Sequence, residues 1–163
     1  MDERFAVVAS AGSFLAEDGA EDGDDVRLPH RWTPGGVGVR SAFTGGHVLN
    51  LAVAACVLND LYREAEAAGV ELLGVRVRAE GGFDTSRWRS TGISYAVEVD
   101  SDAPRALVEA LIAAVDEAAE IPRALRQGAA VTRATRPGPG AGGGAREGAA
   151  PPVCLPRQGR TST

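Results

Sequence analysis

The sequence predicts an α+β fold in which antiparallel sheets pack against two central helices. A nearly unbroken apolar segment, Val48 to Leu58, is too long for an ordinary strand and indicates a buried helix. Segments in which apolar and polar residues alternate lie on either side of it and indicate strands. A second segment, Leu107 to Ala119, carries apolar residues at helical spacing. The predicted order of elements is β-β-β-α-β-β-α-β.

The N-terminal third is predicted to be a small antiparallel meander. The first strand is Arg4 to Ala9, and Gly12 ends it. The acidic, glycine-containing stretch of residues 17–25 is typical of an exposed loop. Residues 26–32 and 37–43 alternate in polarity and supply the second and third strands.

The first helix is predicted to run from Thr44 to Gly69. Thr44 is a suitable N-cap and Gly69 a suitable C-terminal stop. Only Asn50 interrupts the apolar run from Val48 to Leu58. That run is about half the length needed to cross a bilayer, so no membrane span is expected. A helix that is apolar almost all round needs cover that one small sheet cannot give. We therefore expect a homodimer in which the partner chain adds the missing layer.

A hairpin follows this helix. Residues 70–80, which alternate strictly from Val75 to Glu80, and residues 92–99, which alternate again, form its two strands, joined by a long loop at residues 81–90. Trp88 in this loop is expected to be partly buried. Arg76 and Arg78 are expected on a solvated face.

The second helix begins near residues 101–104, where Asp or Ser caps it and Pro104 is tolerated in the first turn. Ile121 and Pro122 interrupt it. Residues 123–127 are expected to add one further turn, and residues 129–133 a last short strand.

The chain divides into one domain, residues 1–134, and a tail, residues 135–163. Residues 1–25 form an acidic, partly flexible lead-in to the domain. The tail is rich in Pro, Gly and Arg without periodicity, so it is predicted to be disordered.

Composition excludes several classes of function. The 163 residues carry a formal net charge of −5, and no basic face for nucleic acid is evident. No basic stretch precedes an apolar run at the N-terminus, so we expect a cytoplasmic protein with reduced thiols. Two cysteines make no disulfide framework, and His30 and His47 are too isolated to form a metal pair. Neither a metal nor another cofactor is expected.

A family resemblance rests on Gly45-Gly46 and the following LNLAVAACVLNDLYREAEAAGVELLGVRVRAEG. With its Ala-Ala-Cys on a Leu- and Ala-rich helix, the chain resembles the OsmC/Ohr superfamily over residues 26 to 133. The segment Ile121 to Leu125 also matches, at a place where the family usually has Cys-Pro. The resemblance implies two-cysteine thiol peroxidases that form intertwined homodimers with the active site at the subunit interface.

The resemblance assigns roles to particular positions. Cys56 falls on the nucleophilic, peroxidatic position. The resolving cysteine would fall at Ile121 and the family's glutamate at about Gly46, so both groups are absent. The activating arginine has three loose candidates: Arg27, Arg31 and Arg40.

Two hypotheses for function follow. In the first, Cys56 is the catalytic residue of a thiol-dependent organic hydroperoxide reductase, and an external thiol replaces the missing resolver. In the second, the chain is a catalytically degenerate dimer that binds a small apolar ligand or serves as an accessory protein. The plain alternative for Cys56 is a small buried hydrophobe. Cys154 is expected to be incidental to the tail, although a flexible tail could bring it to Cys56.

Overall fold

The computed structural model describes residues 4–18 and 26–133. The chain divides after Ala129, and the described residues up to that point form one compact unit. Most of the predicted acidic loop, the predicted tail and Cys154 lie outside the described residues. Residues 129–133 have no regular secondary structure, so the prediction of a last strand there is wrong.

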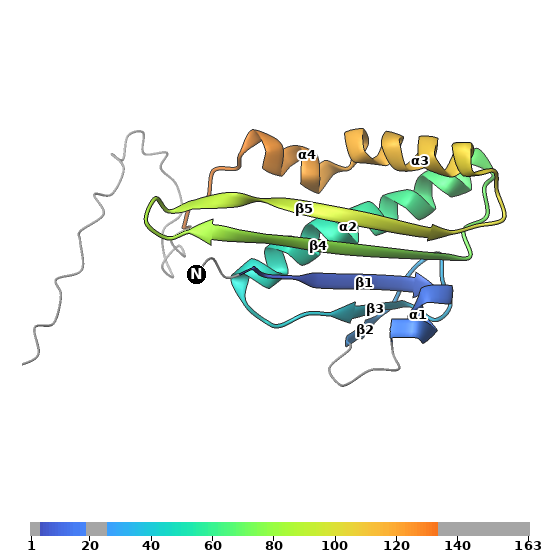
Figure 1. The fold of residues 1–163 in the computed structure, drawn as a ribbon, viewed down its shortest axis with the longest axis horizontal. Coiled ribbons are helices and arrows are strands. Elements are labelled where there is room, and N and C mark those ends of the chain that lie inside the picture. Colours follow the sequence, from blue (N-terminus) through green and yellow to red (C-terminus); the bar gives the residue numbers. More distant parts are fainter. Residues whose placement is uncertain (1–3, 19–25, 134–163) are drawn as a thin grey trace, which may run out of the picture. The chain divides into compact units, whose positions relative to one another are not determined.

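A five-stranded antiparallel sheet forms the framework of the first unit, with the strand order β2-β3-β1-β4-β5 (Figure 1). The strands are β1 (Val7–Gly12), β2 (Val26–Leu28), β3 (Val37–Arg40), β4 (Gly74–Asp84) and β5 (Arg89–Asp100). The α+β class is confirmed. The N-terminal strands and the hairpin, however, belong to one continuous sheet.

The predicted N-terminal meander is wrong, because β1 does not pair with β2. It lies between β3 and β4, with Ala9 opposite Val39 on one side and Val77 on the other. Val7, Ala9 and Ala11 are almost fully buried. A strand with so apolar a face is accommodated best at the middle of a sheet. Strand β1 also lies later in the chain than predicted.

A short helix, α1 (Ser13–Asp18), follows β1 and was not predicted. Gly12 makes the turn between them with a positive φ of 64°. A Cβ atom there would lie 2.1 Å from the carbonyl oxygen of Leu73, so the position requires glycine. Strands β2 and β3 are both shorter than the sequence pattern indicated.

Helix α2 (Gly45–Ala68) is the central helix, and its predicted caps are confirmed. The Thr44 side chain accepts a hydrogen bond from the backbone N–H of His47, and Gly69 ends the helix in the left-handed conformation. The helix runs across the sheet, packing on β1 and β4 (Figure 1). Asn50, the polar interruption, is buried and donates a hydrogen bond to the carbonyl of Phe5.

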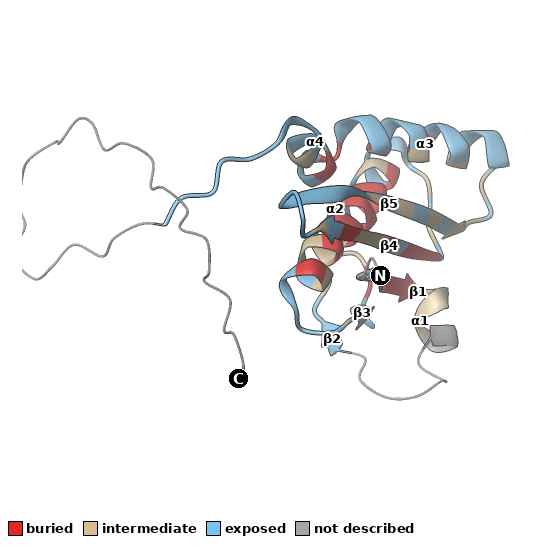
Figure 2. Ribbon diagram, turned by 60° about the vertical axis from the view of Figure 1, so that its left-hand side comes forward, coloured by how far each residue is buried: buried red, intermediate tan, exposed pale blue. Residues whose placement is uncertain are grey.

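Helix α2 is buried on the sides that face the sheet and the helices α3 and α4. Figure 2 shows the buried side next to the strands in red. Val48 on another side is 43% exposed. Several small residues, including Ala52, Ala55 and Cys56, are half-buried. The helix is therefore less completely enclosed within this chain than its composition predicted.

The hairpin of β4 and β5 is confirmed, but its strands extend almost to the turn. Trp88 lies in that turn with a positive φ of 51° and is 87% exposed, so its predicted burial is wrong. Arg76 is only 8% exposed, which corrects the expectation of a solvated side chain. Its guanidinium lies over the ring of Phe14 at 4.4 Å and pairs with Glu98 at 3.2 Å.

Helices α3 (Arg105–Ala118) and α4 (Glu120–Gln127) complete the unit and pack beside α2. They are separated at Ala119, close to the predicted interruption, and Pro122 lies in the first turn of α4. None of the helices among residues 4–18 and 26–133 is both long and apolar enough to cross a membrane.

Candidate functional site

The site is built around Cys56, halfway along α2, where that helix meets the start of α4. The residue is half-buried, and among the described residues it is a free cysteine. The backbone N–H groups of Ile121 and Glu120, at the start of α4, lie near its sulfur and act to lower the pKa of the thiol. Two backbone donors at a helix start create a local environment that favours a negative charge. The position that the family resemblance gives to the resolving cysteine, Ile121, therefore does lie against the thiol.

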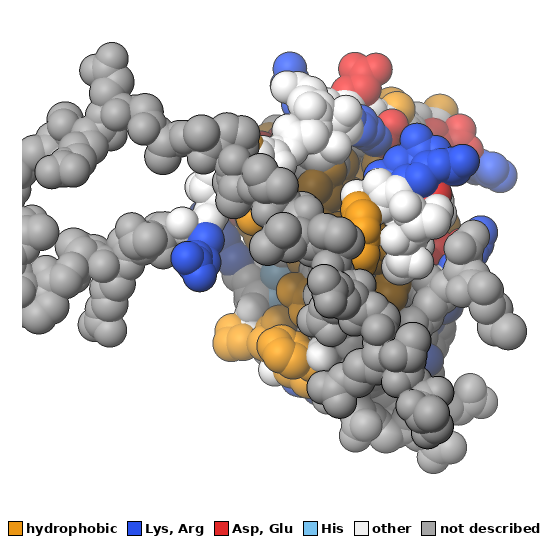
Figure 3. All heavy atoms as spheres, turned by 90° about the vertical axis from the view of Figure 1, so that its left-hand side faces the viewer, with side chains coloured by type: hydrophobic (Ala, Val, Ile, Leu, Met, Phe, Trp, Pro, Cys, Tyr) orange, Lys and Arg blue, Asp and Glu red, His pale blue; other side chains and the backbone are white. Residues whose placement is uncertain are grey.

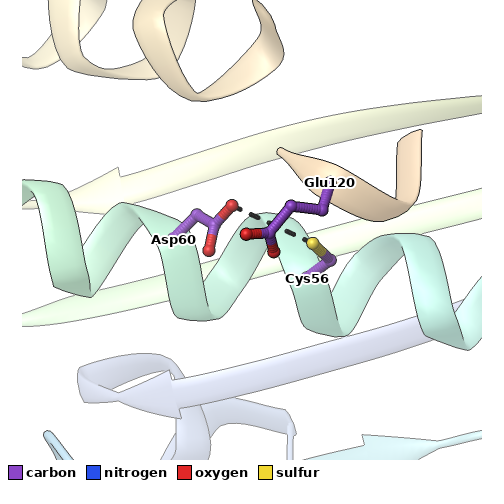
Figure 4. Close-up of side chains that lie close together, drawn as sticks. All are labelled: Cys56, Asp60 and Glu120. Atoms are coloured by element: carbon purple, nitrogen blue, oxygen red, sulfur yellow. Dashed lines mark hydrogen bonds between the residues drawn. The ribbon is translucent and has the colours of Figure 1, made fainter. Parts of the chain in front are cut away.

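Two carboxyl groups face the same thiol, and the sequence prediction missed both. The Cys56 thiol donates to Oδ2 of Asp60 across 3.9 Å, one turn further along α2. Glu120 approaches from α4 (Figure 4). The spacing of four residues between Cys56 and Asp60 is a helical contact that the sequence could have revealed. Glu120 could not be found that way, because its place depends on how two helices pack.

Asp60 is a buried carboxylate with a specific partner. It is only 4% exposed, and Oδ1 lies 2.9 Å from the guanidinium of Arg63. Burial raises the pKa of Asp60 above its usual range, and the nearby Glu120 and Glu64 carboxylates act in the same direction. The Arg63 guanidinium opposes that rise. Cys56, Asp60 and Arg63 thus form a row of thiol, carboxylate and guanidinium along α2.

The electrostatic environment keeps Cys56 protonated near neutral pH. Burial raises the pKa of its thiol above the ordinary value of 9.0, and the Asp60 and Glu120 carboxylates add to the rise. The backbone donors at Ile121 and Glu120 oppose it without reversing it. The surroundings of Cys56 therefore match neither reading from the sequence. An activated nucleophile would have an arginine beside the sulfur, and a purely structural cysteine would have only aliphatic neighbours.

The arginine and glutamate positions of the family are not reproduced near this thiol. Among the described residues, Cys56 bonds to Asp60, and neither Arg27 nor Arg31 makes a hydrogen bond or ion pair with it. Arg31 instead lies over the ring of Trp32 at 5.6 Å. Gly46 has no room for a glutamate, because a Cβ there would lie 2.5 Å from the Phe5 ring.

The thiol and the two carboxylates also have the donor types of a metal site. Their ligand atoms lie within 4.8 Å of one another, and the expectation that the chain binds no metal did not foresee this cluster. Exposed acidic groups often gather without an ion, so this cluster alone does not define a metal centre. His30 bonds to Thr33 and Asn59, and His47 bonds to Thr44.

An apolar cavity of about 390 Å³ lies on the side of α2 that faces α4. Its lining residues are Leu49, Val53, Ser90, Gly92, Ile93, Tyr95, Pro122, Leu125 and Arg126. Val53 lies one turn before Cys56, and Pro122 follows Ile121, so the cavity adjoins the thiol without including it. Arg126 and Tyr95 share Asp116 as a partner and place polar groups at one side of the cavity.

Apolar side chains are also exposed at the end of the molecule seen in Figure 3. A second apolar cavity of about 290 Å³ lies between α2 and the β2–β3 segment, with His30 and Asn59 among its lining residues. Burial lowers the pKa of His30, so this ring is held in its neutral form.

The fold and site together define an α+β protein whose central helix presents a half-buried cysteine to the start of a following helix. A family model for OsmC-like protein matches residues 38–133, and the chain belongs to this family. Among solved structures, it is similar to an OsmC-like hydroperoxide resistance protein from Jannaschia sp. CCS1. The two are 12% identical with a TM-score of 0.51, covering 78% of this chain and 90% of the other. No curated protein sequence matched. At this identity the likeness concerns the fold.

Proposed function

We propose that the chain is a thiol-dependent organic hydroperoxide reductase that uses Cys56 as its nucleophile. The observation that carries the proposal is the meeting of Cys56 with the backbone N–H groups at the start of α4. Such donors stabilise the charge that develops on a reacting sulfur or oxygen. The neighbouring apolar cavity would hold the organic part of the peroxide.

The reaction consumes one hydroperoxide and two external thiols. Cys56 takes an oxygen from the peroxide and becomes a sulfenic acid, and an alcohol leaves. An external thiol then condenses with the sulfenic acid, and a second one releases Cys56 as the thiol. An external reductant is needed because Ile121 stands where the family resemblance places the resolver. We place this activity in the cytoplasm, where thiols are kept reduced.

We also propose that the active form is a homodimer. One side of α2 remains partly open, with Val48 exposed and Ala52, Ala55 and Cys56 half-buried. A second copy would cover this side and enclose the thiol. Light scattering at micromolar concentration should give the mass of a dimer, and a monomeric mass would contradict the proposal.

The direct test of the activity is turnover of cumene hydroperoxide with a dithiol reductant. The wild type should turn over at a rate that Cys56→Ser abolishes. Cys154→Ser, a change outside the described residues, is the matched control and should retain the wild-type rate. Wild-type turnover no faster than that of Cys56→Ser would remove the enzymatic proposal.

The carboxylates around Cys56 disfavour the thiolate form of this residue, and they therefore favour a second, non-catalytic function. In that case the protein would be a degenerate OsmC-like dimer that binds a small apolar ligand in the cavity beside α4. Calorimetry with an apolar alcohol such as cumyl alcohol separates the two functions. Binding without turnover would support the ligand-binding function.

A further inference from the structure

Asp60 is the group in the site that the family resemblance does not account for. It is almost fully buried, it lies one turn from Cys56, and it accepts the bond that the thiol donates. A carboxylate at this position repels a thiolate, because the two negative charges would lie about 3.9 Å apart. The site is therefore unsuited to a thiolate that an arginine stabilises before the peroxide reacts.

A protonated thiol can still react if its proton leaves while the sulfur–oxygen bond forms. We propose that Asp60 is a catalytic residue that accepts the Cys56 proton as the sulfur attacks the hydroperoxide. This inference rests on the proposed function. Asp60 is the carboxylate to which the thiol is hydrogen-bonded, and the Arg63 guanidinium at 2.9 Å helps to keep it ionised and in place.

The step balances in atoms and electrons. The sulfur of Cys56 attacks the terminal oxygen of the hydroperoxide, and the oxygen–oxygen bond breaks. The sulfur is oxidised by two electrons to a sulfenic acid, and the peroxide is reduced. The thiol proton passes to Oδ2 of Asp60 and then to the alkoxide that leaves, which becomes an alcohol.

Several charged groups face the pair and affect its protonation. Arg63 and Glu64 lie beside Asp60 on α2, and Glu120 approaches from α4. Arg63 favours the ionised carboxylate, whereas the two glutamates disfavour it. Asp60 differs from Glu120 in being buried and directly hydrogen-bonded to the thiol. This difference makes Glu120→Gln the matched control.

The test measures two rates on Asp60→Asn in a Cys154→Ser background. Removing the negative charge makes Cys56 easier to ionise, so alkylation by iodoacetamide at pH 7.5, about 1.5 units below the ordinary thiol pKa of 9.0, should accelerate. Reduction of cumene hydroperoxide should fall roughly 100-fold, because the proton acceptor is lost. In Glu120→Gln both rates should rise together. A purely electrostatic role for Asp60 predicts that both rates rise in Asp60→Asn as well, and that result would overturn the proposal.

Arg63→Gln provides a second measurement if Asp60→Asn does not fold. Without the guanidinium the pKa of Asp60 rises, so the acid limb of the peroxidase pH profile should move to higher pH. An unmoved acid limb would overturn the role of Asp60. A wild type without turnover would instead remove the proposed function itself, so the two failures are distinguishable.

Discussion

The backbone N–H of Ile121, at the start of α4, lies near the sulfur of Cys56 in the middle of α2 and acts to lower the pKa of the thiol. The family resemblance places the resolving cysteine at Ile121, whose side chain is aliphatic in this chain. A substitution at this one residue therefore tests whether the site retains the geometry of a two-cysteine peroxidase.

Ile121→Cys, in a Cys154→Ser background, should restore an internal resolver. One equivalent of cumene hydroperoxide should convert the two thiols into a disulfide, seen by intact mass and by loss of free-thiol titration. The control is Gln127→Cys, at the far end of the same helix, which should keep a free thiol. A disulfide in the control but not in Ile121→Cys would contradict the geometry.

Cys56 in the wild type should be a slow thiol. Because burial and two carboxylates raise the pKa of the Cys56 thiol, its alkylation rate with iodoacetamide should still be increasing at pH 9.0, the ordinary pKa of a thiol. Cys154→Ser isolates the signal of Cys56, and glutathione serves as the reference thiol. A plateau reached near neutral pH would mean that a cation, supplied by the partner chain or another segment, has ionised the thiol.

Two adjacent glycines at the start of α2 should respond in opposite directions to alanine. A Cβ added at Gly45 would have no atom within 4 Å, so Gly45→Ala should stabilise the fold by about 0.5 kcal/mol through helix propensity. Gly46→Ala places its Cβ 2.5 Å from the Phe5 ring and should destabilise it by about 1–3 kcal/mol. Urea unfolding followed by circular dichroism measures both. Equal effects would show that Phe5 does not pack on Gly46.

Tyr62 and Tyr95 form a second matched pair. The Tyr62 hydroxyl is buried, with no hydrogen-bond partner among the described residues, whereas Tyr95 donates to Asp116. Tyr62→Phe should therefore leave stability unchanged or raise it by about 1 kcal/mol, and Tyr95→Phe should lower it by about 1 kcal/mol. Urea unfolding at pH 7 measures the difference. The reverse order would contradict the assignment of partners.

Burial also raises the pKa of Tyr62 from 10.0 to about 12. The neutral phenol is favoured in the folded state, so its contribution to stability is fully present below pH 10 and is lost as the pH rises toward 12. The loss is at most about 2.7 kcal/mol. The free energy of unfolding should fall less steeply between pH 10 and 12 in Tyr62→Phe than in the wild type. If the free energies of unfolding of the wild type and of Tyr62→Phe fell in parallel over this pH range, the Tyr62 phenol would be hydrated in the folded state.

The sequence pattern predicted those parts of the fold that depend only on residues close together in the chain. Thr44 and Gly69 end α2 as expected, because capping depends on the residues at the helix ends. The position of β1 in the sheet depends on its pairing with β4, which lies far along the chain, and no local sequence pattern indicated this pairing. Residues 129–133 have an apolar pattern, but their side chains are exposed, so no burial stabilises the expected strand and it does not form.

The candidate site was predictable to a similar extent. Cys56 and its proximity to Ile121 followed from the resemblance to a family. Asp60 was accessible from helical spacing but lay outside the pattern that the family implies. Glu120 depends on the packing of α4 against α2. The electrostatics of the site therefore required the structure, because they arise from groups on two helices.

The central place of β1 also has a consequence for how the chain folds as it is synthesised. Val7 leaves the ribosome well before Ala79, its sheet partner on one side. Until Ala79 follows, β1 exposes one edge and an apolar face that belong in the middle of the sheet. Contacts this distant in sequence slow folding. We therefore expect the nascent N-terminal third to keep this apolar face exposed until β4 has been made, and chaperones bind surfaces of this kind.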